Sequence, residues 1–423
     1  MATMITQHPL ILLTPVQPGK LDSLNEILSK MKAALQSGTE SEFKKLQTVH
    51  YARWVILSRE SFRDEPALPV PVRLIFSSNY DGDEDAHFDD LVSVLEKYID
   101  EVYACCEGYP EAGARNAESR KKYLKQWRIK NSAFYVGAPG RSLNQIHQEN
   151  SLRNHIWSFV LKNNWEGKPA REIHQAIRNE IDSKPEFTWS KEKAKVPGIK
   201  WLPLIAYGLL ILAVLPFMIV WILYIFFFHE LRDKYKPTTL SQIPDSLVSK
   251  LEKDEDLFPQ NQFTQIVVMK PGLVRQLNFR IWMLRTKVLA SYMFVKGKLL
   301  NIPTIHFARW VLFDNKKHVL FFSNFDGSWQ QYLGDFIDQS GWGLSGIFSN
   351  TVNFPTTRFM ITGGAYDEEH FLAWSRSTQI PTHVWYSAYP HLSIQNIINN
   401  TRIRNELHEN LNEKKARLFL KRI

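Results

Sequence analysis

Hydrophobic residues follow two different spacings along the chain, and the two spacings predict alternating strands and helices. Short runs rich in Leu, Ile, Val and Phe predict strands near residue 10, at 49–57 and 72–77, near residue 134, and at 264–269, 304–313, 317–323 and 358–362. Stretches with helical spacing lie between them, at 21–34, 87–98, 273–295 and 329–339 and from residue 367 onward. The order strand-helix-strand-strand-helix-strand therefore occurs twice, which indicates an α+β protein.

Two short motifs recur in the same order in both parts of the chain. His-Tyr-Ala-Arg-Trp at 50–54 is followed by Ser-Asn-Tyr-Asp-Gly at 78–82, and His-Phe-Ala-Arg-Trp at 306–310 is followed by Ser-Asn-Phe-Asp-Gly at 323–327. The repeat extends to the fourth strand if 133–137 is matched with 358–363. We interpret the chain as an internal duplication of a ferredoxin-like domain. The two sheets are expected to pack face to face as an α+β barrel-like sandwich, with a pocket near the sheets.

The repeat predicts three regions. Residues 1–165 form a first ferredoxin-like repeat, 166–260 form a linker, and 261–423 form a second repeat with a C-terminal helical tail. Each repeat is long enough to bury a core of its own.

The linker contains an apolar segment, 201–228, that is long enough to cross a lipid bilayer. Trp201 and Trp221 are expected to act as anchors at the membrane interface, and Pro216 is expected to bend the helix near its middle. Basic residues flank the segment on both sides, which favours two ends on one face of the membrane. Spanning and re-entrant arrangements are both open. Because two repeats that pack together must share a compartment, we expect the segment to enter one leaflet and return, with both halves on the cytoplasmic face.

A second stretch, 273–295, alternates apolar residues with Arg and Lys at helical spacing. It fits a basic amphipathic helix that lies in an anionic membrane interface, and equally an ordinary helix that packs on a sheet. The two interpretations are compatible.

Composition narrows the classes of function. The net charge of +9 fits nucleic acid or an anionic lipid surface, and the basic flanks of the apolar segment account for part of it, so we expect no nucleic-acid partner. Cys105 and Cys106 are adjacent and offer neither a disulfide framework nor zinc-ligand spacing. Nucleotide-binding and hydrolase motifs are absent from the sequence. The expected partners are the lipid bilayer and a lipophilic small molecule, and no oligomeric state is predicted.

The Ser-Asn-Tyr/Phe-Asp-Gly motif and the duplicated topology resemble the dye-decolourising haem peroxidases of the dimeric α+β barrel superfamily. That family carries Gly-x-x-Asp-Gly, with an aspartate that assists peroxide cleavage beside an arginine and a histidine that ligates haem iron. The resemblance implies haem as cofactor, and as catalytic residues Asp326, Arg309 and Asn324, with Asp81 and Arg53 in the other copy. This chain departs from the pattern because Ser78 and Ser323 stand where the family has glycine.

The same residues have structural interpretations. The Asp-Gly pairs could be simple turns, and strand alternation predicts that His306 and Arg309 face opposite sides, with His306 on the side of Ala308 and Trp310. Buried ion pairs of Arg309 with Asp326 and of Arg53 with Asp81 are an alternative to catalysis.

Three histidines are candidates for cofactor binding, namely His306, His50 and His383, and the first and last of these also for binding a metal. The segment at 382–391, which contains His383 and His391, could equally be a packed strand.

Two functions follow. One is a membrane-associated oxidoreductase, haem-dependent and peroxidase-like, that acts on a lipophilic substrate. The alternative is a non-enzymatic module that binds a lipid or small apolar molecule at the membrane surface.

Overall fold

Two four-stranded antiparallel sheets form the centre of the protein. The computed structural model describes residues 5–37, 42–63, 71–234 and 238–423. The first sheet has the strand order β1-β3-β2-β10 and the second has the order β4-β6-β7-β5. Their strands are β1 (Gln7–Pro15), β2 (Val49–Leu57), β3 (Arg73–Asp81), β4 (Ala133–Val136), β5 (Gln260–Val268), β6 (Ile305–Phe313), β7 (His318–Asp326) and β10 (Val384–Ser387).

Each sheet takes its last strand from the other half of the chain. β4 pairs with β6, with Phe134 opposite Arg309, and β10 pairs with β2, with Trp385 opposite Arg53. The two registers are equivalent residue by residue. The fourth strand of the second half is therefore β10, and the match of 133–137 with 358–363 is wrong. The halves are joined through their hydrogen-bonded ladders as well as through side-chain packing.

Residues 358–362 do not form the expected strand. Thr357–Arg358 and Thr362–Gly363 are two-residue strands, β8 and β9, that pair across a tight turn. Phe359 and Met360 have φ values of 54° and 64° in that turn. This left-handed backbone cannot continue a strand, so the apolar run predicted a strand where the chain reverses direction.

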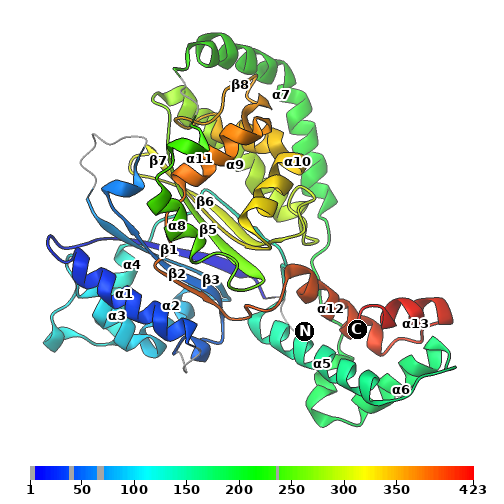
Figure 1. Cartoon of the computed structure of the whole chain (residues 1–423). Helices are drawn as coiled ribbons and strands as arrows, with labels where there is room; N and C mark the ends of the chain where they lie inside the picture. The colour runs from blue at the N-terminus through cyan, green and yellow to red at the C-terminus, as the bar shows by residue number, and fades with distance from the viewer. Residues whose placement is uncertain (1–4, 38–41, 64–70, 235–237) are drawn as a thin grey trace.

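Helices cover the outer face of each sheet, so the molecule has four layers in the order helix, sheet, sheet, helix (Figure 1). The first sheet is covered by α1 (Leu21–Gln36), α2 (Glu84–Val94), α3 (Glu96–Tyr103) and α4 (Ala117–Gln126). The second is covered by α9 (Leu273–Tyr292), α10 (Trp329–Phe348) and α11 (Glu368–Thr378), with α8 (Asp245–Glu252) beside α11. Apolar side chains from both sheets, including Ile11, Val55, Val311 and Phe322, fill the space between them.

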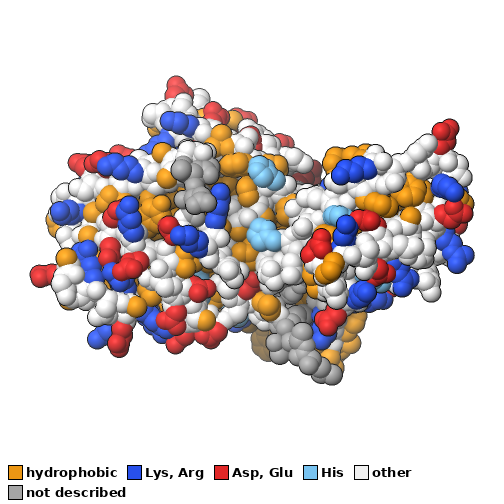
Figure 2. Space-filling model, turned by 90° about the horizontal axis from the view of Figure 1, so that it is seen from below, with side chains coloured by type: hydrophobic (Ala, Val, Ile, Leu, Met, Phe, Trp, Pro, Cys, Tyr) orange, Lys and Arg blue, Asp and Glu red, His pale blue; other side chains and the backbone are white. Residues whose placement is uncertain are grey.

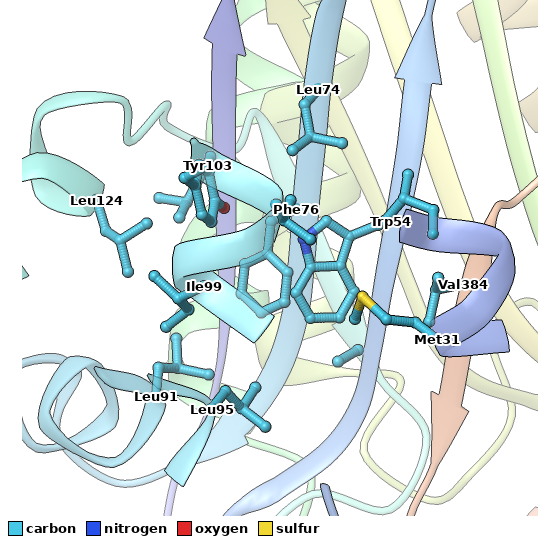
Figure 3. Packing of buried hydrophobic residues seen from close by; sticks show 14 of the residues in the cluster. Met31, Trp54, Leu74, Phe76, Leu91, Leu95, Ile99, Tyr103, Leu124 and Val384 are labelled. Atoms are coloured by element: carbon cyan, nitrogen blue, oxygen red, sulfur yellow. The ribbon is translucent and has the colours of Figure 1, made fainter. Parts of the chain in front are cut away.

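The core of the first half shows how the exchanged strand contributes to packing. Trp54 of β2 lies at its centre, next to Phe76 of β3 and Met31 of α1 (Figure 3). Val384 of β10 packs into the same cluster although it lies more than 300 residues along the chain. The first half therefore cannot complete its core without a residue from the second.

A helical extension projects from the two sheets and carries the C-terminus (Figure 1). It consists of α5 (Leu143–Lys162), α6 (Ala170–Asp182), α12 (Ile394–Leu407) and α13 (Glu413–Leu420). These helices share a core of their own that includes Leu152, Ile177, Ile403 and Phe419. A helical tail at the C-terminus was expected from the sequence, but its packing against the helices that follow β4 was not.

The apolar segment forms one helix, α7 (Trp201–Phe228), with Pro216 inside it. It is long and apolar enough to cross a membrane, and 6% of its most apolar window is buried in the protein. The helix bends as it passes around the second half (Figure 1). Because proline removes one helical hydrogen bond and clashes with the preceding turn, Pro216 accounts for this bend.

Candidate functional site

The two recurring motifs meet at the ends of neighbouring strands and bring a histidine to an aspartate in each half. His50 Nε2 lies 2.9 Å from Asp81 Oδ1, and His306 Nε2 lies 2.7 Å from Asp326 Oδ1. All four side chains are buried. The recurring aspartates and histidines therefore bind each other.

A β-bulge at each histidine corrects the expected side-chain alternation. The register of β6 against β7 shifts by one residue between Ile305 and Phe307, which leaves His306 as the extra residue. Its ring lies near Tyr51 and Tyr389 between the sheets, whereas Ala308 and Trp310 pack under the outer helices. The prediction that His306 shares a face with Ala308 and Trp310 is wrong because strand alternation does not hold across the bulge.

Each aspartate also holds the first residue of a helix in the extension. Asp81 Oδ2 accepts a hydrogen bond of 2.7 Å from the backbone N–H of Leu143, and Asp326 Oδ2 accepts one of 2.8 Å from that of Ile394. A carboxylate is favourable at a helix N-terminus because the unpaired N–H groups there carry partial positive charge. The histidine and aspartate thus fix α5 and α12 against the strand ends.

The recurring arginines cross from one half to the other. Arg309 donates to the carbonyl oxygens of Leu10 and Ser78, at 2.9 and 3.1 Å, and to Asn79 Oδ1 at 2.5 Å. Arg53 makes the equivalent contacts in the second half.

Arg53 donates to the carbonyl oxygens of Phe263 and Ser323, at 3.0 Å each, and to Asn324 Oδ1. The predicted ion pairs of Arg309 with Asp326 and of Arg53 with Asp81 are wrong, since both aspartates are occupied by histidines. In each half the Ser-Asn pair serves instead as the acceptor for the arginine of the other half.

The two guanidinium groups lie together between the sheets. Both lie over the ring of Phe322, at 5.4 and 5.6 Å from its centre. Burial lowers the pKa of Arg53 and of Arg309, and the neighbouring charge of Arg53 lowers the pKa of Arg309 further. Among the described residues neither arginine is paired with a carboxylate, so their positive charges are balanced by carbonyl, amide and hydroxyl oxygens.

These contacts account for each residue of the Ser-Asn-Tyr/Phe-Asp-Gly motif except the aromatic one, which stacks on the following helix. Tyr80 stacks on His87 at 3.8 Å, and Phe325 stacks on Tyr332 at 3.9 Å. Gly82 and Gly327 both have φ of 84°, a conformation that favours glycine. The motif therefore connects a strand, a turn and a helix to the opposite sheet. We call the recurring His, Arg, Ser-Asn and Asp residues of both halves the joint.

The joint differs between the halves at its histidines. His50 Nδ1 lies 3.0 Å from the hydroxyl of Tyr389, whereas His306 Nδ1 is buried with no hydrogen-bond partner among the described residues. The residue that corresponds to Tyr389 after the fourth strand of the first half is Ala138. Sequence reasoning missed Tyr389, although its position follows once the fourth strands are correctly matched.

His383 lies apart from this joint. It precedes β10, and its Nδ1 accepts a hydrogen bond of 3.3 Å from the backbone N–H of Ile56. Burial lowers the pKa of His383 to about 4. The structure therefore does not bring together His383 and His306, the two predicted metal ligands.

The residues present do not fit a haem. His50 uses both ring nitrogens, and the ring of His306 is bound to Asp326 and lies beside the rings of Tyr51 and Tyr389. Arg309 and Asn324, the expected catalytic partners, are engaged in the crossed contacts. Within the described ranges, no group of three or more His, Cys, Asp or Glu side chains is placed to hold a metal ion.

The predicted membrane anchors lie on α7 and are far from the central joint. Trp201 is exposed at the start of the helix, and the indole of Trp221 donates to Asn278 Oδ1 of α9 at 3.3 Å. Pro216 is exposed between them. The structure thus contains two separate features of interest, a buried polar joint inside and an apolar helix outside. No protein-family model, no curated protein and no solved structure matches this chain.

Proposed function

We propose that this protein is a non-catalytic module that inserts into one leaflet of a membrane and binds lipid at its surface, with both halves on the cytoplasmic face. The observation that carries the proposal is α7, an apolar helix that is exposed along most of its surface while both of its ends are attached to the same neighbouring helix.

One narrow seam of α7 faces the protein, and the rest is open. The less exposed residues recur every three or four positions, at Leu204, Tyr207, Ile211, Val214, Met218, Trp221 and Ile225. Most of the remaining positions are large and apolar, and Phe217 is 76% exposed. A soluble protein rarely leaves such an area uncovered, so a lipid phase is its natural environment.

Both ends of α7 are attached to α9. The backbone N–H of Lys200 donates to the carbonyl of Tyr292 at 3.1 Å. At the other end, Asp233 accepts hydrogen bonds of 2.6 Å from Arg275 and 2.7 Å from Lys270. The ends of α7 thus lie at opposite ends of α9, and the two helices run antiparallel.

The lengths of the two helices favour insertion over crossing. At 1.5 Å per residue, α7 is about 42 Å long and α9 about 30 Å, so α7 must bow outward between its attachment points. The bend at Pro216 provides this bow. If α7 crossed the bilayer in this arrangement, the exposed charges Arg280 and Lys287 of α9 would enter the hydrocarbon, which is costly.

Neighbouring surfaces extend the apolar area. Leu273, Leu277, Ile281 and Leu284 are exposed on one side of α9, and Phe359 in the turn between β8 and β9 stacks on Phe226 at 4.2 Å. In contrast, the face shown in Figure 2, opposite the top of Figure 1, carries basic and acidic side chains interspersed. The exposed apolar side chains of α9 and of the turn between β8 and β9 therefore adjoin those of α7, which supports insertion on this side.

The central joint supports a structural role over catalysis. An active arginine or aspartate needs a hydrogen-bonding position that a substrate can take. Arg309, Arg53 and both aspartates instead bind protein groups between packed sheets. The peroxidase reaction stays a prediction from the resemblance, and a Soret band in the absorbance spectrum of the purified protein would contradict the non-catalytic proposal.

Flotation with lipid vesicles tests the proposal. Leu212→Glu, on the open face of α7, is expected to lower vesicle recovery roughly tenfold, because a charge replaces a lipid-facing leucine. Leu161→Glu, on α5, is the matched control, since Leu161 and Leu212 are 64% and 66% exposed. Equal recovery of the two variants would contradict insertion through α7.

Labelling of single cysteines tests the sidedness. The native thiols of Cys105 and Cys106 are buried, so new cysteines at the exposed Glu118 and Lys316 report on the first and second half. In sealed vesicles, both positions are expected to react from the same side. Reaction from opposite sides would show that α7 crosses the membrane.

A further inference from the structure

Arg285 of α9 stands out among the charged side chains near the membrane-facing side because two tryptophans hold it in place. Its guanidinium carbon lies 4.9 Å from the ring centre of Trp282 and 4.4 Å from that of Trp342 on α10. Among the described residues it forms no hydrogen bond and no ion pair. Its five N–H donors are therefore available to an anion.

The two tryptophans are themselves fixed. Trp282 lies against Gly346, where an added Cβ would meet the indole at 2.1 Å, so only glycine allows this approach. The backbone N–H of Trp342 donates to the hydroxyl of Tyr366 at 3.1 Å. The guanidinium is thus held by a preorganised clamp, which reduces the entropy lost when a ligand binds.

A small apolar cavity lies directly beside the clamp. Its volume is about 40 Å³, and its lining includes Trp282, Arg285, Leu289, Trp310 and Trp342. Trp310, one of the lining residues, is 2% exposed. The cavity therefore offers almost entirely apolar walls beside the guanidinium.

The site lies next to α7. Tyr207, on the seam of α7, is close enough to Arg285 for their charges to influence each other. Burial lowers the pKa of Arg285, which is the expected effect of holding a cation without a carboxylate partner. An anion at this position would remove that cost.

We propose that the clamp of Trp282, Arg285 and Trp342 binds the phosphate of an anionic phospholipid, with a short apolar portion of the same lipid entering the cavity. The proposal rests on the membrane insertion proposed above. A phosphate matches the forked donors of arginine, and a membrane lipid is the anion that is concentrated at this surface. The cavity admits a few methylene groups, so the rest of the lipid lies along the exposed side of α9.

Native mass spectrometry of the full chain in neutral detergent measures this binding without requiring a bilayer. The probe is a short-chain phosphatidylglycerol, with phosphatidylcholine of the same chain length for comparison. Arg285→Gln is expected to weaken phosphatidylglycerol binding about tenfold and phosphatidylcholine binding less, because the choline cation beside the same phosphate already disfavours a site that holds an arginine. Arg280→Gln is the matched control, because Arg280 lies on the same helix and is exposed.

A second variant tests the cavity without changing the charge. Gly343 lines the cavity, and an added Cβ would make only an ordinary contact of 3.7 Å with Leu300. Gly343→Val fills the cavity and is expected to weaken binding several-fold while Arg285 stays in place. Excess inorganic phosphate is expected not to displace the lipid, and displacement would show that free phosphate is the ligand.

The outcomes separate this proposal from membrane insertion. Equal losses in Arg285→Gln and Arg280→Gln, or no preference of the native protein for phosphatidylglycerol, would overturn the lipid site. Flotation of Arg285→Gln with neutral vesicles is expected to match that of the native protein. If native protein binds the short-chain lipid in detergent but does not float with vesicles, insertion fails and the lipid site stands.

Discussion

The helices α1 and α9 occupy equivalent places, yet their outward faces differ. α1 follows β1 and α9 follows β5, each after a Pro-Gly pair, and each helix covers its sheet. The outward face of α1 carries charged residues, among them Glu26 and Lys30, which form an ion pair of 2.6 Å. The outward face of α9 carries exposed leucines and isoleucine together with Arg280 and Lys287. The comparison shows that one half carries a more apolar outer surface although the strands beneath the two helices pair in equivalent registers.

Inside the molecule the two halves are almost the same. The crossed arginines, the pairs of histidine and aspartate, and the helix N-termini all have equivalent contacts in both halves. Such equivalence is expected of a joint whose purpose is to bind the halves together. The two halves therefore differ in the side chains of their outer helices and agree in the contacts that join their sheets.

The largest effect is expected from the crossed arginines. Arg309→Ala should lower the free energy of unfolding by roughly 3–5 kcal/mol, because it leaves a large cavity and buried acceptors without a donor. Arg53→Ala should cost a similar amount, since its contacts are equivalent. Urea unfolding in detergent measures both. A large difference between the two would show that the joint is not symmetric in energy.

Combining these two variants sharpens the test. The two guanidinium groups repel each other, as the lowered pKa of Arg309 beside Arg53 indicates. Removing one should therefore relieve the other, and the double variant is expected to lose less stability than the two single variants together. Full additivity would contradict a direct interaction between the arginines.

Much of this fold could be predicted from local sequence. The strand at 49–57 and the apolar helix at 201–228 have the bounds that the sequence indicates. The exchange of β4 and β10 could not be predicted, because strand pairing between distant segments depends on tertiary contacts and not on local pattern. The apolar run at 358–362 was wrongly predicted to form a strand for the same reason.

The residues of the candidate site could be identified from the sequence, but the contacts among them could not. The recurrence of His, Arg and Asp in both halves identified the residues. The pairing was wrong because a bulge at His306 breaks the alternation from which the side-chain directions were derived. Asn79 and Asn324 bind the arginines across the halves, and nothing in the local spacing indicates that contact.

A change on α9 tests the contrast with α1. Leu284→Glu should lower recovery with vesicles by a factor of several, because Leu284 is 61% exposed on the membrane-facing side. Lys30→Gln on the equivalent helix α1 should leave recovery unchanged. A comparable loss in Lys30→Gln would show that both halves face the lipid.

The acid stability of the first half should differ from that of the second. Burial lowers the pKa of His87 to about 3 from its ordinary value of 6.5, and the equivalent position in the second half is Tyr332. Because the unfolded chain binds this proton more readily, stability is present above about pH 6.5 and is lost as the pH falls toward 3. His87 alone should lower the free energy of unfolding by about 2 kcal/mol as the pH falls from about 6.5 to about 5.

His87→Tyr, which copies the residue of the second half, should flatten the dependence of the unfolding free energy on pH in this range. The pKa of His383 is also lowered by burial, so His383 should still contribute to the dependence of the unfolding free energy on pH in this variant. The slope is the measured quantity, so a change in overall stability does not obscure the result. An unchanged slope would mean that His87 does not titrate with unfolding.

The smallest effect concerns the asymmetric contact of His50 with Tyr389. Tyr389→Phe removes the hydroxyl that lies 3.0 Å from His50 Nδ1 and leaves His50 in the same state as His306. The loss of one buried hydrogen bond should cost about 1 kcal/mol in urea unfolding. Tyr386→Phe is the control, because among the described residues its hydroxyl has no partner. If the two variants are equally stable, the second half, with its unpaired nitrogen, is no weaker than the first.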